Sequence, residues 1–397
     1  MIARLAAVFG ALVTLVAAST APAQPYRAAL DAAMRDTCNR QVVMLGETTH
    51  GDGTTVAFKA ALIERLVSRC GFKAVFFEAS FYDFLALDRK LRAREPAGPE
   101  LLQAAVGGLW RYDAEFQPLV PFLLTRAAAG QLALGGIDDQ VGAAGSFYAN
   151  DAMPLEVTEA LPEPRRSECR TLFHQRLYWQ FEGGYQPAHR AALRACAAAA
   201  MGATAASAGD PVTRGERLQM LANIDRQLAR DLGPTEAYIV ARDRSMYLNF
   251  QWLAERLPPG TKIIVWAANA HIAADATASG EYAGPTNLGA FIKQAYGARA
   301  FALGISALSG SFRWSRQEPS RALPAAVPGS LETLALAGGR ADSTYLGNAA
   351  LKRLGVRNGV AFDYAKPAAI DWSRAFDGLV VLRAQHPPQR IDAPLKK

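Results

Sequence analysis

The chain lacks the short motifs that identify the commonest nucleophilic, metal-dependent and nucleotide-binding enzymes. It has no Gly-x-Ser-x-Gly elbow, no Ser-x-x-Lys pair, no His-Glu-x-x-His and no paired Cys-x-x-Cys, and the Walker and dinucleotide fingerprints are missing too. Histidine is scarce, with five residues in 397, and so is cysteine, with four. The usual serine and cysteine hydrolase machinery is therefore excluded, and the position of each histidine becomes informative.

The chain also lacks any run of lysine and arginine. Its formal net charge is +7 and its isoelectric point is about 9.3, but the basic residues are spread along the chain without interleaved aromatic residues. Half of the residues are apolar and a fifth are charged, which is enough apolar material for a large core. We expect a globular protein with a generally basic surface and no nucleic-acid partner.

The N-terminal residues have the pattern of an export signal. Arg4 precedes an apolar stretch at 5–18, and Ala21-Pro22-Ala23 gives the small-x-small pattern that signal peptidase cleaves. The stretch is too short to span a bilayer comfortably, and no second one follows it. We expect a signal peptide at 1–23, a mature chain that starts at Gln24, and export to the periplasm or the medium without stable membrane insertion.

Apolar runs that alternate with helical stretches predict an α/β fold. Continuous apolar runs of this kind are typical of a mostly parallel sheet covered by helices on both faces. The predicted strands lie at 42–46, 72–78, 132–137, 262–267, 300–305 and 378–383. From about 155 to 258 the sequence is rich in Ala, Leu, Arg and Gln and contains no strand candidate. We expect residues 24–397 to form one domain, with an all-helical insertion over the active-site cleft.

The four cysteines are expected to form two disulfides in an exported protein. Cys38 and Cys70 each stand just before a predicted strand, so we place both at the N-terminal edge of neighbouring parallel strands and pair them. Cys169 and Cys196 fall in consecutive helical stretches and form the second bridge by elimination. Free buried thiols are the alternative.

Acidic and basic side chains follow the predicted strands at their C-terminal ends. Glu47 and His50 follow the first strand and Glu78 ends the second, while Asp138 ends the third. Asn269 and His271 follow the strand at 262–267. Ligands of open α/β sheets bind outside the carboxyl ends of the strands. We therefore expect these side chains to share one cleft, where carboxylates and imidazoles activate a water molecule.

Several weak motifs occur in an order that resembles the erythromycin esterase family. The resemblance covers nearly the whole mature chain, which makes the set far more specific than any one motif. The motifs are Gly46-Glu47-Thr48-Thr49-His50-Gly51, Gly71-Phe72 leading to Phe77-Glu78-Ala79, Gly136-Ile137-Asp138, Arg242-Asp243 with Met246 and Asn249, Trp266-Ala-Ala-Asn269-Ala-His271, and Phe376-Asp377-Gly-Leu-Val. The resemblance implies an α/β sheet with a helical portion over the cleft, and hydrolysis of an ester or lactone without a covalent intermediate.

The resemblance also implies roles for single residues. His50 corresponds to the general base, with Glu47 as its carboxylate partner and Glu78 as a second acid, and His271 matches the second histidine of a His-Asn-x-His pattern. The first histidine of that pattern is replaced by Ala268. Four residues are expected to contact the substrate, namely Lys59, Arg242, Asp138 and Asn269. Lys59 stands where the family has a basic residue, often Arg. Plain salt bridges are the alternative role for the two cations, and a purely structural role is the alternative for His271.

Two other functions stay open at this point. Hydrolysis by a histidine-activated water requires no cofactor. However, carboxylates and imidazoles also bind metals, and Glu47, His50, Glu78 and His271 could hold a divalent metal that lowers the pKa of bound water. Alternatively, the protein binds a ligand and has lost turnover together with the histidine that Ala268 replaces. The expected partner in each case is a small molecule, an ester or lactone in the first. The sequence gives no indication of oligomeric state.

Overall fold

A seven-stranded sheet forms the centre of the computed structural model, which describes residues 26–140, 147–230, 236–313 and 318–391. The strand order is β3-β2-β4-β1-β5-β11-β8, and every neighbouring pair is parallel except β11 and β8. The strands are β1 (Val42–Leu45), β2 (Phe72–Ser80), β3 (Ala133–Asp138), β4 (Lys262–Trp266), β5 (Ala300–Ala307), β8 (Ser343–Gly347) and β11 (Gly378–Leu382). The prediction of a mostly parallel α/β sheet is confirmed.

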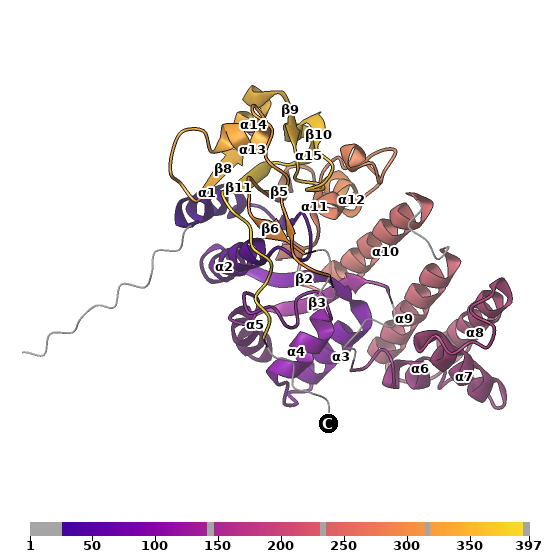
Figure 1. Ribbon diagram of the computed structural model, residues 1–397. Coiled ribbons are helices and arrows are strands. Elements are labelled where there is room, and N and C mark those ends of the chain that lie inside the picture. The colour runs from indigo at the N-terminus through magenta and orange to yellow at the C-terminus, as the bar shows by residue number, and fades with distance from the viewer. Residues whose placement is uncertain (1–25, 141–146, 231–235, 314–317, 392–397) are drawn as a thin grey trace, which may run out of the picture.

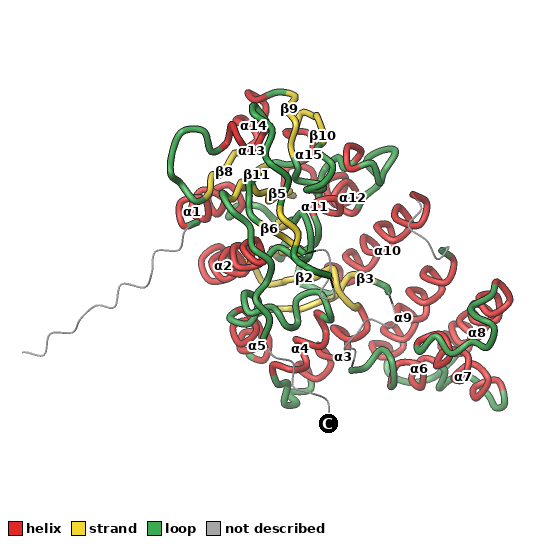
Figure 2. Tube along the Cα trace, in the orientation of Figure 1, coloured by secondary structure: helices red, strands yellow, loops and turns green. Residues whose placement is uncertain are grey.

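Two small antiparallel pairs lie outside this sheet. They are β6 (Ser311–Phe312) with β7 (Arg321–Ala322), and β9 (Val356–Gly359) with β10 (Ala368–Asp371). Figure 2 shows strands of the central sheet in the middle of the molecule with helices around them, and β9 and β10 at its top edge. The helices of the first half are α1 (Arg27–Thr37), α2 (Gly53–Cys70), α3 (Phe81–Arg92), α4 (Pro99–Val106), α5 (Leu119–Ala128), α6 (Ala152–Val157), α7 (Arg165–Leu177) and α8 (Pro187–Ala206). Those of the second half are α9 (Pro211–Ala229), α10 (Glu236–Glu255), α11 (Asn269–Ile272), α12 (Leu288–Tyr296), α13 (Leu331–Ala335), α14 (Asn348–Leu354) and α15 (Trp372–Ala375), with the short 3₁₀ turns η1 (Thr277–Ser279) and η2 (Gly297–Arg299).

The central strands of the sheet are buried on both faces because they are almost wholly apolar. Successive side chains of a strand point to opposite faces, and in β1 Val43 and Leu45 belong to one core while Val42 and Met44 belong to the other. Helices α1, α2, α4 and α5 supply the first core. Helices α10, α12, α14 and α15 supply the second. This three-layer arrangement explains why the predicted strands read as continuous apolar runs.

The chain between β3 and β4 is helical throughout its described part, with five helices, α6 to α10, and no strand. Helices α6 to α9 extend away from the sheet on the side of β3 (Figure 1) and share a core of their own with α3. The predicted disulfide between Cys169 and Cys196 joins α7 to α8 inside this core, with a Cα–Cα distance of 5.5 Å. Helix α10 then returns along the sheet and packs on β3.

The other disulfide is confirmed, but part of the reasoning behind it was wrong. Cys38 and Cys70 are bonded, with their Cα atoms 5.1 Å apart. The strands that follow them are not neighbours, because β4 lies between β1 and β2. The bridge instead crosses the N-terminal end of β4, where the Lys262 ammonium donates hydrogen bonds to the carbonyls of Cys38 (2.8 Å) and Cys70 (2.9 Å).

Both disulfides are compatible with an exported protein. The predicted signal peptide at 1–23 and the predicted start of the mature chain at Gln24 lie outside the described residues. In the part of the chain that is described, no helix has both the length and the apolar character needed to cross a membrane.

Candidate active site

Four adjacent strands carry the predicted site residues to one edge of the sheet. The strand order places β3, β2, β4 and β1 side by side, and all four run parallel. Their C-terminal ends therefore meet at the same edge. Contacts link the residues there. His50 Nε2 lies 3.8 Å from Glu78 Oε1, and His271 Nε2 lies 3.2 Å from the same oxygen. Glu47, His50, Glu78, Asp138 and His271 thus form one connected cluster, as the sequence predicted.

His50 is oriented by a buried ion pair behind it. Its Nδ1 lies 2.6 Å from Glu47 Oε1, and the Lys59 ammonium donates to Glu47 Oε2 at 2.9 Å. The Trp266 indole donates to the same oxygen at 3.2 Å, and the Lys59 ammonium sits 4.2 Å from the centre of that ring. Glu47 and Lys59 are fully buried, whereas 27% of the His50 side chain is exposed. The histidine therefore faces the open side of the site and the lysine supports it from inside the protein.

The second half of the cluster is built around the Arg242 guanidinium, which comes from α10. Its Nη2 donates to Glu78 Oε1 (2.8 Å) and to Asp138 Oδ2 (2.6 Å). Its Nη1 lies 3.1 Å from His271 Nε2. The arginine thus joins the ends of β2, β3 and β4, and 17% of its side chain is exposed.

His271 is held by two groups, Asp243 and Tyr282, to which the sequence assigned no role. Its Nδ1 lies 2.9 Å from Asp243 Oδ1, and the Tyr282 hydroxyl donates to Asp243 Oδ2 at 2.7 Å. Burial lowers the pKa of His271, but the charges of Asp243 and Glu78 outweigh it and raise that pKa to about 10. His271 is therefore an imidazolium near neutral pH, donating to an acid from each ring nitrogen. The signal for Asp243 was its place directly after Arg242 in a family motif, whereas nothing local pointed to Tyr282.

Neighbouring charges also set the protonation of His50 and Glu78. Burial lowers the pKa of the His50 imidazole, but the nearby Glu78 and Glu47 carboxylates outweigh it and raise that pKa. Burial raises the pKa of Glu78, but the neighbouring imidazoles and the Arg242 guanidinium outweigh it and hold that pKa well below its usual range. Burial also lowers the pKa of Lys59 to about 8, although its ion pair with Glu47 opposes this. Glu78 is consequently ionised across the whole neutral range.

Two residues expected to contact the substrate have other partners in the structure. Asn269 is buried, and its amide donates to the carbonyls of Ile305 and Ala361, both at 2.7 Å, while its oxygen accepts from the Ile305 N–H. A Cβ atom at Gly46 would lie 1.9 Å from that oxygen, so only glycine fits there. Lys59 contacts Glu47 inside the protein, as described above. Asn269 thus links the segment after β4 to β5 and to the segment after β9, and Lys59 supports Glu47.

Two further buried residues lie close to His50. Trp110 is fully buried and contacts the His50 ring edge-on, with centroids 5.5 Å apart. The buried Asp52, which hydrogen-bonds within the turn that carries His50, was not assigned any role from sequence.

The metal alternative can be compared with the arrangement of donor atoms. Across residues 26–140, 147–230, 236–313 and 318–391, no group of three or more His, Cys, Asp or Glu side chains is arranged to hold a metal ion. The Arg242 guanidinium lies between Glu78 and Asp138 and donates a hydrogen bond to each.

Comparison with known proteins agrees with the resemblance noted in the sequence. Three solved structures share the fold at 16–18% identity. One is a Bacillus cereus protein from structural genomics (TM-score 0.72, 18% identity, 91% of this chain and 93% of that chain). Another is described as a succinoglycan biosynthesis protein (0.70, 18%, 92% and 93%). The third is a mutant of the erythromycin esterase EreC in its open conformation (0.64, 16%, 91% and 95%).

The sequence itself matches the erythromycin esterase family over residues 67–384. This segment contains Glu78, Arg242 and His271, and the contacts described above add Glu47 and His50, which precede it. The match indicates an esterase-like hydrolase. The chain belongs to the erythromycin esterase family.

Proposed function

We propose that this protein hydrolyses a carboxylic ester or lactone with a water molecule that His50 activates. The observation that carries the proposal is the contact between His50 Nδ1 and Glu47 Oε1 at 2.6 Å, with Lys59 and Trp266 donating to the other Glu47 oxygen. When His50 Nδ1 donates its hydrogen bond to Glu47, the lone pair of Nε2 faces Glu78 and the open side of the site. That tautomer is the one a general base requires.

In the proposed reaction, the water oxygen bonds to the carbonyl carbon while its proton passes to His50 Nε2. The carbonyl electron pair moves onto the oxygen and gives a tetrahedral oxyanion. When that intermediate collapses, the bond to the alcohol oxygen breaks and His50 returns the proton to the leaving alkoxide. The products are a carboxylic acid, which ionises in solution, and an alcohol, joined in one molecule when the substrate is a lactone.

Positive charge for the oxyanion comes from Arg242 and from the His271 imidazolium. Both lie within 3.2 Å of Glu78 Oε1, and Asp243 keeps His271 positive. Preorganised cations of this kind stabilise charge that develops in the transition state. We assign Asp138 to holding Arg242 in place, since it accepts a 2.6 Å hydrogen bond from that guanidinium. Arg242 thus keeps its expected place at the substrate, and Asp138 acts through it.

A direct attack by water is favoured because, among the described residues, no serine, threonine or cysteine side chain hydrogen-bonds to the base. All four cysteines are in disulfides. Within the described part of the chain, His50 has one hydrogen-bonding side-chain partner, Glu47, and no serine or threonine hydroxyl hydrogen-bonds to it. The covalent alternative predicts a burst of alcohol before steady state and trapping of an acyl-enzyme by hydroxylamine, and we expect neither.

The test is a screen of chemically diverse esters and lactones, macrolides included, with the purified mature protein. Each substrate is run with and without EDTA. We expect hydrolysis of at least one class, unchanged by the chelator, and loss of that activity in His50→Ala but not in His174→Ala, which removes an exposed histidine of α7. Loss of activity with EDTA, restored by added metal, would favour the metal-dependent alternative. Saturable binding without hydrolysis of any substrate would favour the binding protein.

A further inference from the structure

The turn that carries His50 is fastened to the rest of the protein at several points. It joins β1 to α2 over residues 46–52. The Thr48 hydroxyl donates to the Ile305 carbonyl and the Thr49 hydroxyl donates to the Arg313 carbonyl, both at 3.2 Å. A Cβ atom at Gly51 would lie 1.5 Å from the Arg313 carbonyl oxygen, so the backbones approach too closely for any other residue. The position of His50 therefore depends on how this turn is held.

Asp52 is the last residue of the turn and is completely buried. Its Oδ2 accepts hydrogen bonds from the Thr49 N–H (3.1 Å) and the Tyr364 hydroxyl (3.0 Å). Its Oδ1 is also buried but accepts no hydrogen bond from any described residue. An ionised carboxylate in such a place would lack donors for one oxygen, and it would stand near the Glu47 carboxylate. A neutral carboxyl group lowers the first cost, because an unpaired neutral group is less costly to bury than an unpaired charge, and it removes the repulsion from Glu47.

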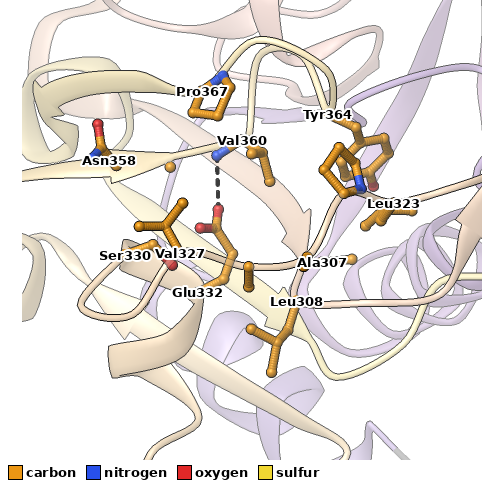
Figure 3. A pocket seen from close by; sticks show the side chains of 14 residues that line it. Ala307, Leu308, Leu323, Val327, Ser330, Glu332, Asn358, Val360, Tyr364 and Pro367 are labelled. Carbon is orange, nitrogen blue, oxygen red and sulfur yellow. Dashed lines mark hydrogen bonds between the residues drawn. The ribbon is translucent and has the colours of Figure 1, made fainter.

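Tyr364 connects this acid to a distant part of the chain. It belongs to the segment between β9 and β10, is fully buried, and packs against Phe312 with ring centroids 5.0 Å apart. Figure 3 shows it beside Leu323 at a small pocket that also contains Glu332. The volume of that pocket is about 40 Å³, room for only a few water molecules. Packing therefore fixes the Tyr364 ring, and its hydroxyl gives Asp52 a rigid anchor.

We propose that Asp52 is a positioning residue of the hydrolysis, acting as a neutral acid that fastens the His50 turn to Tyr364, and that its ionisation at alkaline pH disrupts the productive position of His50. The proposal predicts an effect on the rate of hydrolysis (the rate arm), which rests on the proposed function. It also predicts an effect on folding stability (the stability arm), which does not. Burial raises the pKa of Asp52 to about 8, and the charge of Glu47 adds to this, while the Thr49 and Tyr364 hydrogen bonds oppose it.

Four titratable groups face Asp52. They are Glu47, His50 and Tyr364, with Lys59 further along α2. Glu47 is paired with the Lys59 ammonium at 2.9 Å, and burial raises the pKa of Tyr364 far above the range of interest. His50 determines the acid side of the profile. Lys59 is the competitor on the alkaline side, because burial lowers its pKa to about 8 as well. An experiment must therefore separate Asp52 from Lys59.

Asp52→Asn is a close replica of the neutral acid. The amide oxygen takes the place of Oδ2 toward Thr49 and Tyr364, and the amide nitrogen takes the place of Oδ1, where a neutral acid carries its proton. Lys59→Arg is the matched comparison, because arginine keeps its charge throughout this range. Tyr364→Phe removes one donor that favours the ionised form, so we expect it to move the ionisation of Asp52 to higher pH.

The rate arm measures kcat/KM between pH 5 and 10 on an ester identified by the screen. From pH 7.5 to 9.5 we expect the wild-type value and the Lys59→Arg value each to fall more than tenfold, as loss of one essential proton requires. We expect the Asp52→Asn value to change less than threefold over the same interval, and the Tyr364→Phe fall to begin at higher pH. An alkaline fall that persists in Asp52→Asn and disappears in Lys59→Arg would overturn the proposal.

The stability arm needs no substrate. A folded-state pKa of about 8 means that folded Asp52 retains a proton that the unfolded chain releases near pH 4. Wild type should therefore lose stability relative to Asp52→Asn as pH rises from 4 to 8. We expect the difference between their urea midpoints to grow across that window and then level off. Asp225→Asn, which changes a surface acid paired with Arg194, is the control and should show no such growth.

Failure of the proposed function and failure of the Asp52 proposal give different results. If no ester is hydrolysed but the midpoint difference grows as expected, the proposed function fails and Asp52 is still the neutral buried acid. In that case the ring signals of His50 in an NMR titration, assigned by their loss in His50→Ala, report on its position directly. Besides the shift caused by protonation of the ring itself, they should show in wild type a shift with a midpoint near pH 8 that is absent from Asp52→Asn. A midpoint difference that stays constant from pH 4 to 8, or His50 signals that titrate identically in both proteins, would refute the proposal.

Discussion

Asp243→Asn is the substitution that most sharply separates the electrostatic role of the His271 site from its packing. Asp243 accepts from His271 Nδ1 at 2.9 Å, from the Tyr282 hydroxyl at 2.7 Å and from the Leu288 N–H at 2.9 Å. Asparagine keeps the shape and one acceptor oxygen but removes the charge. That charge is the main influence raising the pKa of His271. We therefore expect the pKa of His271 to be much lower in the variant, so that the imidazolium loses its proton more readily.

The size of the effect follows from the pKa. A rise from 6.5 to about 10 corresponds to at most roughly 5 kcal/mol of folding free energy, at about 1.4 kcal/mol per pKa unit. Removing one partner of a buried ion pair typically costs about 3 to 5 kcal/mol. Because the folded-state pKa of His271 is raised, this stability is fully present below pH 6.5 and is lost as pH rises through about 10. We expect Asp243→Asn to be destabilised by about 3 to 5 kcal/mol at pH 6.5 and by much less at pH 10.

Urea denaturation at pH 6.5, 8 and 10, followed by circular dichroism, measures this directly. Tyr282→Phe is the matched control, because it removes a hydrogen bond to Asp243 without removing charge, and it should cost about 1 kcal/mol at every pH. Equal destabilisation of Asp243→Asn at all three pH values would refute the reasoning, because the loss would then come from packing or hydrogen bonding alone. A loss below 1 kcal/mol at pH 6.5 would refute it as well.

Two further predictions concern the residue that departs from the family and the disulfide at the sheet edge. Ala268 donates its N–H to Glu78 Oε2 at 2.9 Å, so a side chain at this position lies beside the site, and Ala268→His should raise hydrolysis of macrolide lactones if the lost imidazole limits that activity. A variant that stays inactive on every macrolide, while the parent hydrolyses another ester, would instead indicate adaptation to a different substrate. Replacing Cys38 and Cys70 by serine opens a loop with a sequence separation of 32 and should lower the free energy of unfolding by about 3 to 4 kcal/mol in urea melts. A loss within 1 kcal/mol would contradict that estimate.

Much of the fold was predictable because local sequence determines it. Val42 to Leu45 and Ile263 to Trp266 are apolar at every position and give buried parallel strands, with acids and imidazoles just beyond them. The convergence of Glu47, His50, Glu78 and His271 was predictable because the carboxyl ends of parallel strands lie at one edge of the sheet, where ligands bind. The insertion of β4 between β1 and β2 was not predictable, because strand order depends on pairing between segments far apart in the chain.

The contacts inside the site were less predictable than its location. Asn269 follows a strand just as His271 does, yet its amide bonds the carbonyls of two other segments. Lys59 lies on α2 with nothing nearby in sequence to show that its ammonium reaches Glu47, twelve positions earlier. Tyr282 and Tyr364 come from loops whose approach to Asp243 and Asp52 is decided by tertiary packing alone.

The measurement that tests the central claim most directly is kcat for His50→Ala on an ester identified by the screen. We expect kcat to fall by roughly 10² to 10⁴, the usual contribution of a positioned general base. The urea midpoint should stay close to that of wild type, because His50 is partly exposed, and His174→Ala should match wild type in both respects. A folded His50→Ala protein that retains more than a tenth of the wild-type kcat would contradict the assignment of His50 as the base.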